Sequence, residues 1–193
     1  MGKLFDPHYH TIQSDGDSKI LESVDAAKRA GLAALIITDH LNRFGYTDSY
    51  RTNKNLVTTL TGPHKPDKYP IIIGMEFGLP PAVGFGEVLI FGTEICQAIQ
   101  NNLAEINNFD LAEFKKLKDR HKCAIVQCHP NKEATGVDER ILQIIDACEI
   151  TRSGNAHYNY EKILEDCKKK GITPVASSDG HIAYRDSELI YEV

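Results

Sequence analysis

Apolar runs with the length of β-strands alternate along this chain with amphipathic runs that have helical spacing. The strand-like runs occupy residues 34–37, 71–73, 88–91, 124–126, 147–150 and 173–176. Strands that alternate with helices in this way form β/α units, in which neighbouring strands are parallel and the helices cover the sheet. The pattern therefore predicts an α/β protein built on parallel strands.

The helices are predicted from apolar residues that recur every three or four positions. They lie at 20–30 (ended by Gly31), within the long polar connection 43–70, at 111–117, around Val137, Ile141 and Ile144, and at 160–167 (ended by Gly171). The link between Gly78 and Gly86 is too short for a crossover helix, so the strands beside it are expected to pair antiparallel or irregularly. No internal repeat or linker divides the sequence. We therefore expect a single domain over residues 1–193, with its strands in a distorted barrel.

The composition narrows the class of protein. The chain is 41% hydrophobic and 25% charged, with a formal net charge of −5. This charge argues against a protein that coats a polyanion, which would usually show a basic face. The five cysteines have no Cys-x-x-Cys spacing, which predicts reduced thiols, and no segment reaches the length of a membrane span. We expect a cytoplasmic protein that does not bind membranes.

Two pairs of metal-binding side chains stand near the two ends of the sequence. His8 and His10 are separated by one residue, and Asp179 and His181 repeat that spacing. In an extended segment, residues i and i+2 point to the same face, so each pair can present two donors together. Imidazole and carboxylate together form the donor set of zinc, manganese and iron. The two pairs therefore predict a metal site.

Further candidate ligands follow apolar runs in the middle of the sequence. His40, Glu76 and His129 each come directly after such a run. In barrels of parallel strands, the side chains that follow the strand ends gather at one mouth, so ligands scattered along the sequence can converge there. Cys128 precedes His129 and is expected in the core instead, because neighbours in a strand point to opposite faces.

Five short motifs thus occur in order along residues 8–181. They are His8-x-His10-Thr11 with Ser14-Asp15-Gly16, Thr38-Asp39-His40, Gly74-Met75-Glu76, Cys128-His129-Pro130, and Ser178-Asp179-Gly180-His181. This order resembles that of the PHP family (polymerase and histidinol phosphatase). The resemblance implies a distorted, TIM-like β/α barrel of seven strands that holds three divalent metal ions and hydrolyses phosphate esters.

The resemblance also implies, position by position, which residues hold the ions. The first ion would be held by His8, His10, Glu76 and Asp179, the second by Glu76 and His129, and the third by Asp15, His40 and His181. One position departs from the family pattern, because Glu87 stands where members usually carry a histidine for the second ion. Glutamate can replace imidazole and would favour manganese or iron. We expect Glu87 to be a ligand; the alternative is a solvated side chain and a weak or empty second site.

The expected reaction is hydrolysis of a small phosphorylated substrate by a metal-activated hydroxide. A phosphate monoester is anionic and repels hydroxide until cations neutralise its oxygens. Glu76 and Asp179 are the expected catalytic ligands, with two to three zinc, manganese or iron ions as cofactors. Arg152 follows the strand at 147–150, where its guanidinium would bind phosphate or pair with a surface acid. Nucleic acid is expected only as a nucleotide or a short oligonucleotide end.

Two other classes remain open. A noncatalytic metal-binding accessory module with a degraded second site is compatible with Glu87. A metal-dependent amidohydrolase shares the His-x-His pair of its first strand with this chain. Such enzymes often use a modified lysine, and no lysine stands at a suitable strand end here. Turnover of phosphate esters with added metal would distinguish the phosphoesterase from the accessory module.

Overall fold

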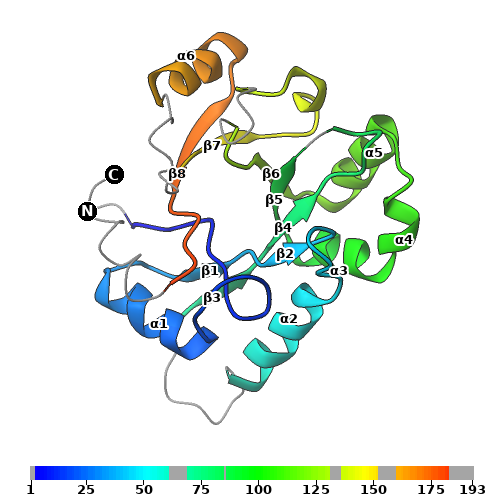
Figure 1. Ribbon diagram of the computed structural model, residues 1–193. Coiled ribbons are helices and arrows are strands. Elements are labelled where there is room, and N and C mark those ends of the chain that lie inside the picture. Colours follow the sequence, from blue (N-terminus) through cyan, green and yellow to red (C-terminus); the bar gives the residue numbers. More distant parts are fainter. Residues whose placement is uncertain (1–2, 61–68, 85, 131–135, 152–159, 183–193) are drawn as a thin grey trace.

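The computed structural model describes residues 3–60, 69–84, 86–130, 136–151 and 160–182. In this part of the chain the strands are β1 (Leu35–Ile37), β2 (His40–Leu41), β3 (Ile71–Ile73), β4 (Met75–Gly78), β5 (Glu87–Phe91), β6 (Ala124–Gln127), β7 (Ala147–Thr151) and β8 (Thr173–Ser177). β1 pairs with β3 in a small sheet, and the others form a larger sheet in the order β2-β4-β5-β6-β7-β8 (Figure 1). The protein is a mixed α/β domain.

Helices surround the strands on the outside (Figure 1). They are α1 (Ile20–Arg29), α2 (Ser49–Leu60), α3 (Thr93–Asn101), α4 (Leu103–Ile106), α5 (Leu111–His121) and α6 (Tyr160–Lys170). The predicted helices at 20–30, within 43–70, at 111–117 and at 160–167 are thereby confirmed. No helix in the described residues combines the length and the apolar character that crossing a bilayer requires.

The helix predicted around Val137, Ile141 and Ile144 is wrong. The segment forms only a short 3-10 helix, Glu139–Ile141, whose first turn is capped by the Asp138 carboxylate accepting from the Arg140 N–H. All three apolar side chains are nevertheless buried in the main core. Their burial from a single tight turn produced the spacing that the sequence analysis interpreted as a helix.

The two faces of the larger sheet carry different side chains. Phe77 of β4 and Val88 of β5 pack in the main apolar core with Ile95 of α3 and Phe114 of α5. Because successive strand residues alternate between faces, Glu76 lies on the opposite face, away from these helices. Acidic and histidine side chains are therefore collected on the face of the sheet that the outer helices do not cover.

β5 runs against both of its neighbours, whereas the other strand pairs are parallel. The expected antiparallel pairing across the short link between Gly78 and Gly86 is confirmed. Glu87, the first residue of β5, lies opposite Gly78, the last residue of β4. The reversed direction thus places the beginning of β5 at the same edge as the ends of its neighbours.

The N-terminal segment lies between two distant parts of the chain. The His10 N–H donates to the Gly180 carbonyl oxygen at 2.8 Å, and the Thr38 N–H donates to the Tyr9 carbonyl oxygen at 2.9 Å. Tyr9 and Gly180 form a parallel bridge. These bonds bring residues from both ends of the sequence beside the ends of the strands. The described residues contain no closed sheet, so the seven-stranded barrel stays a prediction.

Candidate metal centre

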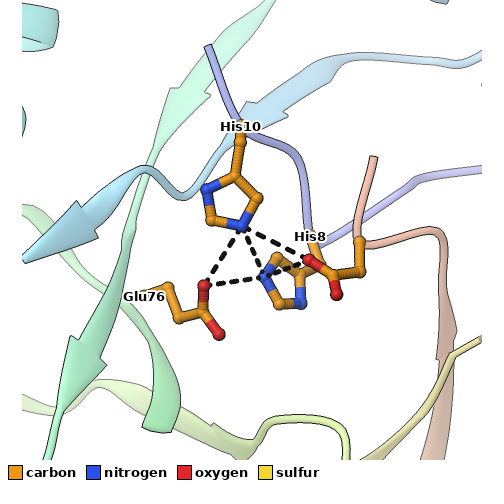
Figure 2. Close-up of side chains that lie close together, drawn as sticks. His8, His10 and Glu76 are labelled. Atoms are coloured by element: carbon orange, nitrogen blue, oxygen red, sulfur yellow. Dashed lines mark hydrogen bonds and ion pairs between the residues drawn. The ribbon is translucent and has the colours of Figure 1, made fainter. Parts of the chain in front are cut away.

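Four donor atoms from distant parts of the sequence converge beside the ends of the strands. They come from His8 and His10 in the N-terminal segment, Glu76 in β4 and Asp179 after β8, and all four residues are buried. Figure 2 shows His8, His10 and Glu76 directed toward one another. The Nε2 atoms of the two histidines are 3.0 Å apart. His8 Nε2 lies 3.2 Å from Glu76 Oε2 and 3.3 Å from Asp179 Oδ1, and His10 Nε2 lies 3.1 Å and 3.4 Å from the same two oxygens.

These separations fit donors that share one cation. Two atoms bound at about 2.1 Å to the same ion lie roughly 3.0 Å apart at a right angle and 3.4 Å apart at a tetrahedral angle. Every measured pair falls within that interval. Glu76 Oε2, moreover, is buried and has no hydrogen bond of acceptable geometry. A buried carboxylate oxygen in this position is costly unless a charge faces it, so the four donors fit a divalent metal ion.

A second group of donors surrounds the same glutamate. His129 Nε2 lies 2.8 Å from Glu76 Oε1. His40 Nδ1 lies 3.0 Å from Glu76 Oε2 and 3.0 Å from Glu87 Oε1, and all three of these atoms are buried without a hydrogen bond. Glu87 is only 6% exposed, which contradicts the alternative of a solvated side chain. Its Oε2 is 3.9 Å from His129 Nε2, so Glu87 lies closer to His40 than to His129.

A third group lies on the more open side of the centre. Asp15 Oδ2 is 3.3 Å from His40 Nε2 and 3.4 Å from His181 Nε2. The side chains of Asp15 and His181 are 38% and 35% exposed, in contrast to the buried donors behind them. His181 Nδ1 donates to the Asp179 carbonyl oxygen at 2.8 Å, which leaves Nε2 of the neutral ring free of a proton. The structure thus brings together all nine side chains that the sequence analysis named as ligands.

The charges of the centre shift the pKa values of His8 and Glu76 in opposite directions. Burial alone would lower the pKa of His8, but the negative charges of Glu149, Glu76 and Asp179 outweigh it and raise that pKa well above the usual value. Burial would raise the pKa of Glu76, but the charge of His8 and the close rings of His10 and His129 hold it well below its usual range. Without metal, the charged forms of His8 and Glu76 therefore stabilise each other.

Asp39 holds the turn that carries two of the ligands. Its carboxylate accepts from the Thr11 N–H and the Thr11 hydroxyl, each at 2.7 Å, and from the Ser14 hydroxyl. Gly16 completes the turn, because a Cβ at this position would lie 2.5 Å from the His10 carbonyl oxygen. The Ser-Asp-Gly part of the first motif is thus explained by a turn packed closely beneath His10.

The prediction that Cys128 lies in the core is confirmed, but the residue also borders the metal-binding donors. Cys128 packs with Leu89 and Val126, as a core residue would. Its Sγ also lies within 4.8 Å of donor atoms of Glu76 and His129. Alternation does not separate Cys128 from His129 because β6 ends at Gln127 and His129 has a φ of 21°. Burial and the surrounding carboxylates raise the pKa of the thiol well above its usual value.

Glu149 was not predicted from the sequence. This residue of β7 is fully buried and contacts the ring of His8 and the backbone of His129. The available signal was an acidic residue inside the apolar run 147–150, where a charge needs buried partners. Arg152, the predicted phosphate-binding residue, lies outside the described residues.

The fold resembles several solved structures. PsfC from Pseudomonas syringae PB-5123 has a TM-score of 0.69 and 19% identity, over 94% of this chain and 77% of that one. A protein from Bifidobacterium adolescentis assigned as a metal-dependent phosphoesterase has a TM-score of 0.60 and 15% identity, over 94% of this chain and 88% of that one. Histidinol phosphate phosphatase from Lactococcus lactis has a TM-score of 0.51 and 16% identity, over 98% of this chain and 90% of that one; its structure is a complex with zinc, L-histidinol and phosphate. At these identities the likeness shows the fold alone.

Sequence comparison identifies the family. No protein of curated function shows significant similarity to the chain. The PHP domain, by contrast, matches residues 6–191, which span all five motifs and every side chain of the centre. The chain belongs to the PHP domain family.

Proposed function

We propose that this protein is a metal-dependent phosphoesterase that hydrolyses a small phosphorylated substrate at a multinuclear centre. The observation that carries the proposal is the convergence of His8, His10, Glu76 and Asp179, with donor atoms 3.0–3.4 Å apart. Family membership supports it. So do two neighbours of similar fold, one assigned as a metal-dependent phosphoesterase and one a phosphatase with zinc and phosphate.

We assign the donors to three divalent ions and count His40, which lies between the second and third groups, with the third. The first comprises His8, His10, Glu76 and Asp179; the second Glu76, Glu87 and His129; the third Asp15, His40 and His181. Mixed imidazole and carboxylate donors suit zinc, manganese and iron. The hydrogen bonds that join residues 8–10 to Thr38 and Gly180 also support the proposed distorted barrel, since they link the first and last elements of the chain.

The negative charges of the carboxylates in the centre require cations if an anionic substrate is to bind. Asp15, Glu76, Glu87 and Asp179 would repel an anionic phosphate ester if nothing offset their charge. Bound divalent ions would neutralise the phosphoryl oxygens and activate water as the nucleophile. Asp15 and His181 form the more exposed side, where the substrate would approach the buried donors. Arg152 is proposed to bind the phosphate oxygens from the segment after β7.

The test is phosphate release from p-nitrophenyl phosphate and from a panel that includes histidinol phosphate, nucleotides and short oligonucleotides with terminal phosphates. The chelated protein is assayed after addition of zinc, manganese or iron. Turnover with at least one metal is expected, and none without metal. Glu76→Gln, which loses the shared carboxylate, should abolish it.

Absence of phosphate release with every metal would contradict the proposal. If the ions bind with the expected stoichiometry and no substrate is hydrolysed, the protein is a noncatalytic metal-binding module. The burial of Glu87 among the donors favours the enzyme, because a degraded site would not be expected to retain a buried acid whose oxygen faces His40.

A further inference from the structure

Glu149 is a fully buried acid beside the centre that the proposed ligand groups do not use. Its Oε1 lies 2.6 Å from His8 Nδ1, and it also accepts from the Ser177 hydroxyl. Its Oε2 accepts from the His129 N–H at 2.6 Å. We infer that Glu149 is a positioning residue that fixes the ring of His8 and the backbone at His129, and so sets the geometry of two metal sites. The inference rests on the metal binding proposed above.

The contact with His8 determines which ring nitrogen faces the metal site. An ionised carboxylate only accepts hydrogen bonds, so Nδ1 must carry a proton. The neutral ring then has an unprotonated Nε2, and this atom is directed toward Glu76, His10 and Asp179. Carboxylates in this position orient metal-binding histidines and raise their basicity. Glu149 thus selects the tautomer that the first site requires.

The distances separate this contact from metal ligation. Atoms bound to one ion are roughly 3.0–3.4 Å apart, as estimated from metal–ligand bonds of about 2.1 Å. The pairs that involve His8 Nε2 fall in that interval, whereas His8 Nδ1 and Glu149 Oε1 are 2.6 Å apart. This shorter separation is that of a short hydrogen bond, since charge-assisted N–H···O bonds are about 2.7–2.9 Å long. Glu149 Oε1 and His8 Nδ1 are therefore assigned to a hydrogen bond rather than to a shared cation.

The second oxygen of Glu149 acts on a strained part of the backbone. His129 has a φ of 21°, which is unfavourable for a residue with a side chain. The hydrogen bond from its N–H to Glu149 Oε2 holds this conformation, and the ring then reaches Glu76 Oε1 at 2.8 Å. One carboxylate thus holds a ligand of the first site and a ligand of the second.

The test compares Glu149→Gln with Glu165→Gln, a matched change on the exposed surface of α6. Glutamine has one acceptor oxygen, so its amide group must face either His8 Nδ1 or the His129 N–H. Zinc or cadmium affinity, measured by calorimetry, should fall by about 10- to 100-fold in Glu149→Gln, the usual effect of removing such a partner. Glu165→Gln should leave affinity unchanged. Equal affinities in the two variants, both folded by circular dichroism, would overturn the inference.

A measurement on the unaltered protein tests the same inference without depending on a variant that folds. In the cadmium-loaded protein labelled with nitrogen-15, NMR should show a proton on His8 Nδ1 and coupling of cadmium to Nε2. Coupling to Nδ1, or a cobalt complex with a thiolate charge-transfer band from Cys128, would overturn it. Neither readout uses turnover, so a protein that binds cadmium in this way but releases no phosphate contradicts the proposed function and leaves the role of Glu149 intact.

Discussion

Glu76 is common to the donor groups around it. Its Oε2 faces His8, His10 and His40 at 3.0–3.2 Å, and its Oε1 faces His129 at 2.8 Å. Glu76 lies within β4, which pairs with β2 on one side and β5 on the other. The hydrogen bonds between these strands, rather than a loop, therefore fix its position. A rigid carboxylate in this place can hold neighbouring ions at a constant separation, which phosphoryl transfer by paired metals requires.

Glu76→Gln is expected to reduce the number of bound metal ions by more than one per chain. The amide keeps the size of the side chain but loses the charge that faces four histidines. Asp15→Asn should remove at most the ion of the third group, because Asp15 faces the donor atoms of His40 and His181 and approaches His10 only at Nδ1, the ring nitrogen that does not face the first site. Metal content by native mass spectrometry distinguishes the two variants, and equal losses would contradict the shared role of Glu76.

Metal uptake should release protons and weaken as the pH falls. Burial alone would lower the pKa of His40, but the close carboxylates of Asp15 and Glu87 raise that pKa to about 10. Its ring is therefore protonated at neutral pH in the metal-free protein, and an incoming ion must displace the proton. Apparent affinity should rise as the pH increases toward that pKa. Calorimetry in buffers with different heats of ionisation counts the protons, and a count of zero would contradict this expectation.

Residue patterns identified the ligands better than they identified the groups that support them. His8, His10 and Asp179 stand out because donor residues with a spacing of two are uncommon and occur at both ends of the chain. Glu149 carries no such pattern, since its role depends on Ser177 and His129 being brought beside it by β8 and β6. For Cys128, the rule of alternation failed because it holds only within a strand.

At the scale of elements, chain direction explains how Glu87 joins the centre. The shortness of the link before β5 predicted an antiparallel or irregular pairing, and the structure shows the antiparallel one. It did not predict that Glu87 would face His40 more closely than His129, because that depends on how β2 pairs with β4. Likewise, the apolar spacing correctly predicted that Val137, Ile141 and Ile144 are buried, but it wrongly predicted that their backbone is helical. Apolar periodicity reports which side chains face the core, and a tight turn can satisfy it as well as a helix.

Asp110→Ala should destabilise the protein by about 1 kcal/mol through loss of the cap of α5. The Asp110 carboxylate accepts from the Glu113 N–H, and the Glu113 carboxylate accepts from the Asp110 N–H, both at 2.9 Å. Asp119→Ala breaks only an exposed ion pair with Lys115 on the same helix, so it should cost less than about 0.5 kcal/mol. Urea unfolding measures both variants, and equal costs would show that the cap contributes nothing specific.

At the scale of the whole molecule, the centre joins the two ends of the described chain. The Asp6 carboxylate accepts from the Ser178 N–H at 3.0 Å and from the Ser178 hydroxyl, and the Gly180 N–H donates to the His8 carbonyl oxygen at 3.2 Å. These contacts involve or directly adjoin the ligands His8, His10 and Asp179. A cation shared by these residues would therefore connect segments that are separated by almost the full length of the sequence.

Chelation of the metal should lower the thermal stability of the protein and loosen these two segments first. A ligand present at a thousand times its Kd stabilises the folded state by about 4 kcal/mol, because it binds only that state. For a chain of this size, each kcal/mol corresponds to a change of about 2–4 °C in Tm. Hydrogen exchange should accelerate at residues 8–11 and 178–181 and change little in α5, which lies on the outside of the sheet. Glu76→Gln serves as the control, since a protein that has lost the ions of the first and second groups should respond less to chelator than the native protein does. An unchanged Tm in the native protein, or uniform acceleration of exchange across all helices, would show that no metal ion joins the two ends.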